Sequence, residues 1–240
     1  MSASPYTYSF FRIAKDADIA ISAEKYKQLR LEALSVAPAS FSSTYEIESA
    51  FKDTEWVSRL VANGRETFVC AAIPRSVGDG DTPADSRVRT LEESSIWVGQ
   101  LTLRGALSVE DFTLPEESGQ WRATEGTEGA DMEFWQMLSL FTLPAHRGQG
   151  LGKRLCQEAL KYLASYRKCP RKVWVRLMVK PENHATVSLY RGLGFTEAGK
   201  CTLAEALVAN GDRDLLPEDI SGDKYSSRGG LIMMLEVGRS

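Results

Sequence analysis

The segment at residues 140–153 reads LFTLPAHRGQGLGK, and the fold depends on the turn that it contains. The apolar run at residues 133–143 predicts a strand that ends at Pro144. The run at residues 151–166 places leucines at helical spacing and predicts a helix. Between strand and helix, three glycines within residues 148–152 let the backbone curl and allow a ligand to approach its amides.

The start of the predicted helix is suited to an anion. Its first amides are unpaired and carry a partial positive charge, so the turn could hold a phosphate or pyrophosphate. Residues 146–172 contain eight basic residues and one acid, a net charge of +7, while the rest of the chain carries −10. Two other phosphate-binding motifs fail on spacing. A Walker A loop needs Ser or Thr where Arg154 stands, and G-x-G-x-x-G needs glycine where Lys153 stands.

Outward from the turn, predicted strands and helices follow one another without an internal repeat or an interdomain linker. We expect six or seven strands and about four helices in a single α+β domain over residues 1–240. Polar stretches without a hydrophobic period predict surface loops at residues 76–93, 108–131 and 210–230. Ser43 and Glu46 have the spacing of a helix capping box. Strands are predicted at residues 8–14, 67–73, 95–103, 133–143, 173–179 and 231–237.

Composition narrows the class of protein. A chain of 240 residues with 43% hydrophobic residues can bury a full core. A net charge of −3 argues against a general nucleic-acid binder. The longest apolar runs, at residues 69–73 and 231–235, are far shorter than the roughly 20 residues of a membrane span. The N-terminus lacks a signal-peptide pattern, and the four cysteines lack metal-binding spacing, so we expect a cytoplasmic protein with reduced thiols and no metal.

The turn and the segment that follows resemble two motifs of the GCN5-related N-acetyltransferase (GNAT) superfamily. Motif A, [QR]-x-x-G-x-[GA] after a strand and a proline-containing bend, is similar to residues 147–152. Motif B, N-x-x-A-x-x-L-Y-x-x-x-G-F, is similar to residues 183–195, with Thr186 in place of alanine. The two motifs in this order and spacing are more specific than either alone. Residues 30–34 are similar to the first-helix region, at lower specificity.

This resemblance implies a GNAT-like mixed sheet, flanked by helices and splayed open between its fourth and fifth strands. Acetyl-CoA would lie in the split and leave as CoA, with its pyrophosphate on the glycine turn. Its pantetheine arm would pair with the end of the fourth strand, and Tyr190 would be the catalytic residue near the sulfur. The residues expected to bind the cofactor are Leu140, Phe141, Thr142, Arg147, Gly148, Gln149, Gly150, Leu151, Gly152, Lys153 and Asn183.

The chemistry of acetyl transfer indicates what Tyr190 and the backbone amides of the fourth strand would do. An aliphatic ammonium has a pKa of about 10.4, so the acceptor must lose a proton before it attacks. Tyr190 can donate a proton or a hydrogen bond to the departing sulfur. Backbone amides near Phe141 and Thr142 can stabilise the oxyanion without any side chain.

The general base cannot be read from the sequence. In the histone-acetylating branch a glutamate stands in the fourth strand, at the position that aligns with Gln136, which cannot accept a proton. Glu133 lies further away, and an ordered water is equally suited. Tyr45 and Glu46 fall where the superfamily lines its acceptor pocket, although a helix cap would also explain Glu46. His146 lies beside the turn and is interpreted as structural.

Three functional hypotheses follow. The leading one is an acetyl-CoA-dependent N-acetyltransferase acting on a small primary amine, without a metal, nucleic-acid or membrane partner, and possible as a homodimer. The second is an acetyltransferase for protein N-termini or lysine side chains. The third is a non-catalytic acyl-CoA-binding protein. The acidic remainder of the chain favours a cationic acceptor through long-range attraction.

Overall fold

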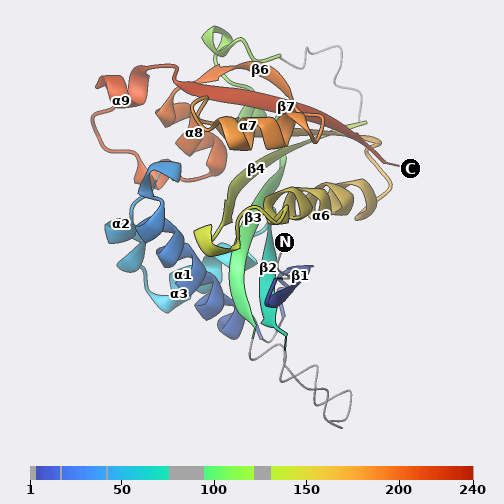
Figure 1. Ribbon diagram of the computed structural model, residues 1–240. Helices are drawn as coiled ribbons and strands as arrows, with labels where there is room; N and C mark the ends of the chain where they lie inside the picture. The colour runs from blue at the N-terminus through green and yellow to red at the C-terminus, as the bar shows by residue number, and fades with distance from the viewer. Residues whose placement is uncertain (1–3, 17, 42, 76–94, 122–130, 240) are drawn as a thin grey trace.

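The computed structural model describes residues 4–16, 18–41, 43–75, 95–121 and 131–239, which are arranged around a seven-stranded mixed sheet (Figure 1). The strand order is β1-β2-β3-β4-β5-β7-β6. Neighbouring strands are antiparallel except β4 and β5, which are parallel. The strands are β1 (Tyr6–Arg12), β2 (Arg65–Pro74), β3 (Ile96–Leu107), β4 (Met132–Thr142), β5 (Lys172–Val179), β6 (Thr196–Cys201) and β7 (Gly230–Gly238).

The described residues form eight α-helices, where the sequence predicted about four. Helices α2, α5 and α9 have only four or five residues, and segments this short leave little hydrophobic periodicity in the sequence. The helices are α1 (Ile19–Val36), α2 (Tyr45–Ser49), α3 (Asp53–Val61), α5 (Val109–Phe112), α6 (Leu151–Ser165), α7 (His184–Arg191), α8 (Leu203–Asn210) and α9 (Asp223–Ser226).

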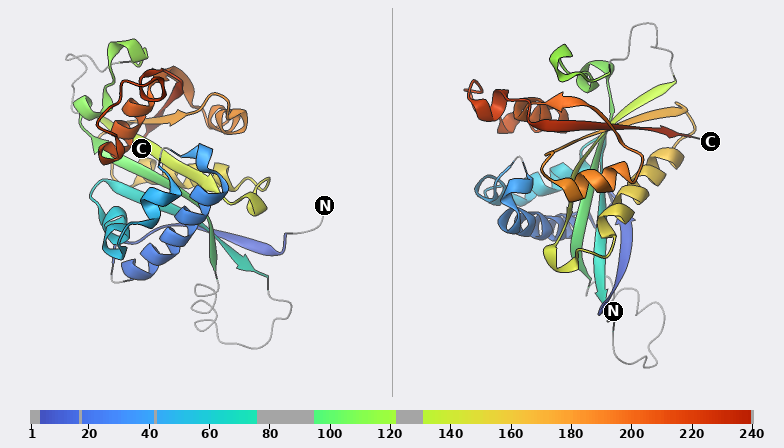
Figure 2. Two further views of the ribbon diagram at one scale, coloured as in Figure 1. Left: turned by 90° about the vertical axis from the view of Figure 1, so that its left-hand side faces the viewer. Right: turned by 45° about the horizontal axis from the view of Figure 1, so that its top comes forward.

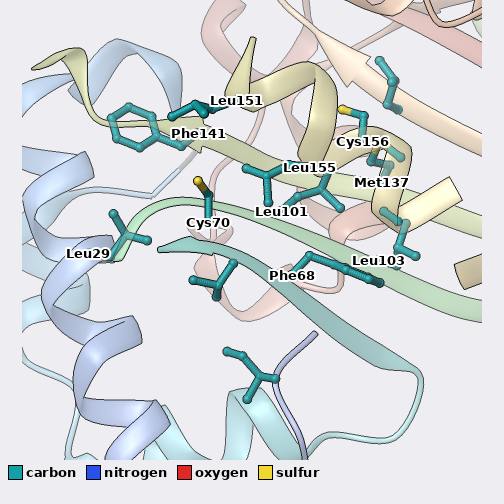
Figure 3. Close-up of a cluster of buried hydrophobic side chains, with 14 of the residues drawn as sticks. Leu29, Phe68, Cys70, Leu101, Leu103, Met137, Phe141, Leu151, Leu155 and Cys156 are labelled. Carbon is teal, nitrogen blue, oxygen red and sulfur yellow. The ribbon is translucent and has the colours of Figure 1, made fainter. Parts of the chain in front are cut away.

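The helices cover both faces of the sheet. Helices α1 and α3 pack against β3 and β2 on one face, while α6 packs against β2, β3 and β4 on the other (Figures 1 and 2). Leu29 of α1, Leu101 of β3 and Leu155 of α6 belong to the same hydrophobic core, which Figure 3 shows in part. In Figure 1, β7 runs at a steep angle to β2 and β3, so the two ends of the sheet are strongly twisted relative to each other.

The capping box predicted for Ser43 and Glu46 is wrong by one residue. Thr44 is the N-cap of α2, and its hydroxyl accepts a hydrogen bond from the Ile47 amide at 3.4 Å. Threonine is also a favoured N-cap residue, and the neighbouring serine gave the same sequence signal one position too early. Glu46 therefore lies in the first turn of α2, where its carboxylate is close to the unpaired amides.

Two of the three predicted loops contain short helices. The predicted loop at residues 76–93 lies outside the described residues. Of the loop at 108–131, residues 108–121 include α5 and a 3-10 turn at Glu116–Ser118, and residues 122–130 are not described. The stretch at 210–230 contains a 3-10 turn at Arg213–Leu215 and α9. Within the described ranges, every helix is too short or too polar to cross a bilayer.

Candidate functional site

The sheet opens between β4 and β5. Their parallel pairing ends at Met137 and Leu177, so residues 138–142 of β4 have no partner on β5. The register between β3 and β4 shifts at the same place, and Ser139 adopts a left-handed conformation with φ 57°. A bulge of this kind bends its strand. The predicted splay between the fourth and fifth strands is therefore confirmed, and β4 presents unpaired backbone groups to it.

The glycine turn follows directly at the end of this open segment. Gly148 and Gly150 have positive φ values of 78° and 72°, and a Cβ at either position would meet no atom within 4 Å. Gly150 is the N-cap of α6, and the Arg154 amide donates to its carbonyl at 3.1 Å. The three amides before Arg154 precede the first helical hydrogen bond and remain available. The turn therefore fits the pyrophosphate expected from the sequence, because its amides are open to an anion.

The basic side chains around the turn have different surroundings. Arg147 donates from Nε to the Thr142 carbonyl at 3.0 Å, so it ties the turn to the last residue of β4. Arg154 lies over the ring of Phe10, 4.2 Å from its centroid. Lys153 and Arg154 are both exposed at the start of α6, but of the two only Arg154 makes such a ring contact in the described part of the chain. Of the two basic residues that flank the turn on the helix side, Lys153 is thus better placed than Arg154 to meet a phosphate.

His146 is held by the first strand. The hydroxyl of Tyr8 and Nδ1 of His146 lie 3.0 Å apart, and the Tyr6 ring packs 5.1 Å from the imidazole. Burial lowers the pKa of His146, which favours the neutral ring. These contacts agree with the structural interpretation of this residue.

Tyr190 and Asn183 lie at opposite ends of α7, on the α6 side of the sheet. Tyr190 is 6% exposed, and its ring packs against Phe195 at 5.6 Å. Burial, with a smaller contribution from Cys156, raises the pKa of Tyr190, so the phenol stays protonated at neutral pH. No hydrogen bond to its hydroxyl is found within the described part of the chain. Asn183 is the N-cap of α7 and accepts from the Thr186 amide at 3.3 Å.

The two polar residues considered on β4 both have partners away from the split. Glu133 is buried beneath α6 and accepts hydrogen bonds from Trp135, Tyr166, Arg167 and Arg239. Burial alone would raise the pKa of Glu133, but these donors hold it at about 2. Gln136 faces the other side of the sheet, where its Oε1 accepts from Arg176 at 2.7 Å. Neither side chain is free to take a proton from an acceptor.

The residues proposed for the acceptor pocket lie on the surface of α2. Tyr45 is 44% exposed, and Glu46 is exposed as well. Hydrogen bonds from its own amide and from the Thr44 hydroxyl lower the pKa of Glu46, as expected at a helix N-terminus. The buried carboxylate of this short helix is Glu48, which accepts from Arg30 at 2.9 and 2.6 Å.

A set of buried polar residues on the face opposite α6 was not predicted from the sequence. They include Gln100 of β3 and Arg176 of β5, each with none of its surface exposed. Both interrupt otherwise apolar strands, in WVGQLTL and VWVRLMV, and this interruption was the available signal. A polar residue in a buried strand requires a partner or a function.

The described residues form neither a candidate metal site nor a disulfide bond. Among them, no three His, Cys, Asp or Glu side chains come together as metal ligands would. Cys70, Cys156 and Cys201 are buried and Cys169 is exposed, and all four are free thiols. Burial raises the pKa of Cys70 and Cys156 to about 12, so both are neutral at pH 7.

The split strands, the open glycine turn and α7 contain the two segments that resemble the GNAT superfamily in the sequence, and a family model supports that resemblance. The model of the acetyltransferase (GNAT) family matches residues 118–195, which include both motifs. No curated protein matches the sequence.

Solved structures share the fold at low sequence identity. NAA60 of Arabidopsis thaliana, solved with acetyl-CoA, is 15% identical with a TM-score of 0.51, covering 96% of this chain and 99% of that one. A candidate acetyltransferase of Acinetobacter baylyi is 13% identical with a TM-score of 0.53, covering 97% and 94%. A GNAT-family acetyltransferase of Streptococcus pneumoniae is 12% identical with a TM-score of 0.50, covering 97% and 100%. At such identities the likeness concerns the fold.

Proposed function

We propose that this protein is an acetyl-CoA-dependent N-acetyltransferase that moves an acetyl group to the primary amine of a small molecule. The observation that carries the proposal is the succession of an open β4 edge, a glycine turn with free amides and the start of α6. An extended backbone edge suits the amides of a pantetheine arm, and the turn suits a pyrophosphate. The structure of the Arabidopsis thaliana protein contains acetyl-CoA, which supports the same choice of cofactor here.

The chain's own groups supply the remaining requirements. Acetyl-CoA, when bound, provides the thioester that the amine attacks. Backbone groups at residues 138–142 lack partners on β5 and can donate to the developing oxyanion. Tyr190 is a phenol and keeps its proton at neutral pH, burial raises its pKa further, and it can donate to the leaving thiolate. The amine nitrogen gains the acetyl carbon, the carbon–sulfur bond breaks, and the amine proton leaves for water. Tyr190 then regains from water the proton that it gave to the thiolate.

We infer that water is the final acceptor of the amine proton. Glu133 is occupied by four donors and Gln136 has no basic group. A carboxylate with a pKa of about 2 is also too weak a base to deprotonate an ammonium group with a pKa of about 10.4. Direct attack by the minor neutral form of the amine predicts turnover that rises with pH toward the pKa of the acceptor.

Acetylation of protein N-termini or lysines is the alternative within the same fold. A peptide acceptor needs an open groove with unpaired backbone edges. On the face of the sheet opposite α6, the end of α8 lies against the strands, where the Asn210 side chain accepts from Gln136 at 3.2 Å and the Ala209 carbonyl accepts from Arg104 at 3.0 Å. This coverage favours a small acceptor over an extended chain.

The release of free CoA from acetyl-CoA tests the proposal. Two acceptor pools are compared, one of small primary amines and one of short peptides with free N-termini and lysines. The proposal predicts CoA release with the small-amine pool. Release with the peptide pool alone would favour the protein-modifying alternative. Binding of acetyl-CoA without release in either pool would favour the non-catalytic acyl-CoA-binding protein.

A further inference from the structure

Within the described structure, the end of β4 has a neighbouring strand on one side only. Residues 138–142 lie beyond the last residues that pair with β5, although Phe141 still pairs with Gln100 of β3. Ser139 has a positive φ of 57°, and the register between β3 and β4 shifts here. A bulged segment with fewer backbone hydrogen bonds opens more readily than a fully paired strand. The backbone groups that the proposed reaction needs therefore require support from side chains.

Phe141 anchors this segment through its side chain. The residue is 5% exposed, and the centroid of its ring lies 5.4 Å from that of Phe41, with 48° between the two planes. From the glycine turn, the Arg147 guanidinium lies 5.4 Å from the centroid of the Phe141 ring. Arg147 also donates to the Thr142 carbonyl at 3.0 Å, so it is fixed to the same segment. The end of β4 is thus held by a ring that both Phe41 and Arg147 contact.

Phe41 belongs to the connection between α1 and α2. It follows the 3-10 turn Pro38–Ser40, and its amide donates to the Pro38 carbonyl at 3.3 Å. The Arg30 guanidinium of α1 lies over the Phe41 ring, 4.4 Å from its centroid. A guanidinium over an aromatic face is an attractive cation–π contact, and burial strengthens it. The ring of Phe41 therefore has a defined position relative to α1.

Arg30 is itself fixed by a buried ion pair. Its Nε and Nη2 donate to the two carboxylate oxygens of Glu48 at 2.9 and 2.6 Å. Arg30 is 6% exposed and Glu48 has none of its surface exposed. Burial alone would raise the pKa of Glu48, but Arg30 and Arg59 lower it, so the carboxylate is charged at neutral pH. A pair with two parallel hydrogen bonds fixes the plane of the guanidinium, and with it the surface on which the Phe41 ring rests.

These contacts form a continuous series from α2 to the glycine turn. The members in order are Glu48, Arg30, Phe41, Phe141 and Arg147. The first three belong to α1, α2 and their connection, and the last two belong to the end of β4 and the turn. Phe41 is the member that joins the two parts. It is therefore placed so that the helical layer supports the strand segment that has lost its partner on β5.

We propose that Phe41 is a positioning residue, which holds Phe141 and with it the end of β4 in the geometry that the developing oxyanion needs. The inference rests on the proposed function. Phe41 has no polar side-chain atom, so it exchanges no proton and forms no bond with the reactants. Its effect comes from placement, because hydrogen-bond donors stabilise a transition state best when they are fixed beforehand. A displacement of about 1 Å in such a site lowers the rate by up to about 100-fold.

Phe51 provides a matched control in the same helical layer. The Arg59 guanidinium lies 4.5 Å from the centroid of the Phe51 ring, and the Trp56 ring lies 5.7 Å away. Phe41 and Phe51 are both half-buried and pack against the same core. The partners of Phe51 in these contacts belong to α3, whereas Phe41 contacts Phe141 of β4. A packing role alone therefore predicts the same outcome for the loss of either ring.

Kinetics distinguish positioning from packing. Phe41→Leu and Phe51→Leu each remove one ring, so we expect similar falls in melting temperature, and assays are run well below both transitions. We expect kcat to fall about tenfold in Phe41→Leu and in Phe41→Met, which fills the space without a ring, and to stay unchanged in Phe51→Leu. Phe41→Tyr keeps the ring and should keep the kcat of the unaltered protein. Equal kcat values in the leucine variants, or a Phe41→Tyr variant as slow as Phe41→Leu, would overturn the proposal.

Hydrogen exchange tests the same link without turnover. Mass spectrometry of the full chain follows deuterium uptake by a peptide that contains residues 138–142. We expect uptake to be about tenfold faster in Phe41→Leu than in the unaltered protein or in Phe51→Leu. If no acceptor is acetylated, this result still supports the hold of Phe41 on β4, so failure of the proposed function is recognised separately. Uptake that is unchanged in Phe41→Leu, or equally fast in both leucine variants, would overturn the proposal even where acetylation is observed.

Discussion

Tyr190 packs its ring in the core, and the role of its hydroxyl has to be tested separately from that packing. Its ring contacts Phe195 in the core, so the aromatic part is accounted for by packing. The hydroxyl oxygen is not among the buried polar atoms that lack a hydrogen-bond partner within the described ranges, so the packing of the ring does not close it off. Burial raises the pKa of Tyr190, which makes the residue a hydrogen-bond donor at every physiological pH.

We predict that Tyr190→Phe lowers kcat roughly 100-fold, the size expected for loss of an acid catalyst. The ring stays in place, so the affinity for acetyl-CoA and the melting temperature should change little. Steady-state kinetics give kcat, and calorimetric titration with acetyl-CoA gives the affinity. Turnover equal to that of the unaltered protein would remove Tyr190 from the mechanism.

Glu133 illustrates a buried carboxylate with a structural role. Its partner Arg239 has a fully buried side chain, which would be left as an unpaired charge without the carboxylate. Arg239 also donates to the Leu163 carbonyl of α6 at 2.7 Å, so the pair ties the end of the chain to this helix. The interaction thus stabilises the packing of α6 on β4, away from the split.

We predict that Glu133→Gln lowers the free energy of unfolding at pH 7 by about 3 kcal/mol, as for a broken buried ion pair. The pKa of Glu133 falls from its usual 4.5 to about 2 on folding, so the carboxylate stabilises the protein above about pH 4.5. That contribution is lost as the pH falls toward about 2, and the two proteins should converge there. Urea unfolding over this pH range measures the difference.

The control for Glu133 is an exposed ion pair. Glu197 pairs with Arg191, and the two side chains are 52% and 60% exposed. Glu197→Gln should therefore cost no more than about 1 kcal/mol. A pH-independent loss in Glu133→Gln, or an equal loss in both variants, would contradict the role given to the buried pair.

At the scale of elements, the strand–turn–helix unit was predicted closely from the sequence. The predicted strand at residues 133–143 is β4, and the predicted helix at 151–166 is α6, each within a residue or two. Local signals decide such units, because the apolar period, the proline and the glycines lie next to one another in the chain. Helix α7 lies within residues 183–195, the segment that resembles motif B.

The buried polar face could not be predicted in the same way. Its members come from β2, β3, β5, α1 and the α8 end, and only the tertiary fold brings them together. Gln100 and Arg176 each stood out as a polar residue in an apolar strand, but the sequence could not show that both face the same side. The short helix α2 is a further example, since Glu46 was singled out and Glu48 is the buried carboxylate.

The turn itself gives a prediction at this scale. Gly150→Ala places a side chain at φ 72°, where no neighbouring atom would clash, so the cost is conformational and about 1–2 kcal/mol. We expect acetyl-CoA to bind about tenfold more weakly, because the backbone must relax away from the conformation that presents its amides. Gly229→Ala is the control, since it also has open space but no positive φ. Equal affinities in the two variants would contradict an anion site at this turn.

At the scale of the whole molecule, charge acts differently at long and short range. The chain as a whole carries −3, and the stretch around α6 carries +7. The positive stretch lies where the pyrophosphate is expected, so long-range attraction favours the cofactor at one end of the split. On the opposite face, Arg65, Arg59 and Arg30 act on Asp212, and the linear sequence divides these groups among several elements.

Turnover without a metal is a further prediction for the whole enzyme. Tyr190 and the backbone groups of β4 supply the donors that acetyl transfer needs, so we expect full activity after treatment with EDTA and desalting. The CoA-release assay before and after treatment measures this. Activity that falls with EDTA and returns with zinc or magnesium would show that a metal site had been overlooked.

The most direct test of the central claim is to follow a labelled acetyl group from acetyl-CoA by mass spectrometry in the small-amine pool. Our account predicts that the label appears as an amide on the nitrogen of a small primary amine, and that Tyr190→Phe slows its appearance about 100-fold. Label that remains on acetyl-CoA in this pool, while the protein binds acetyl-CoA, would contradict it.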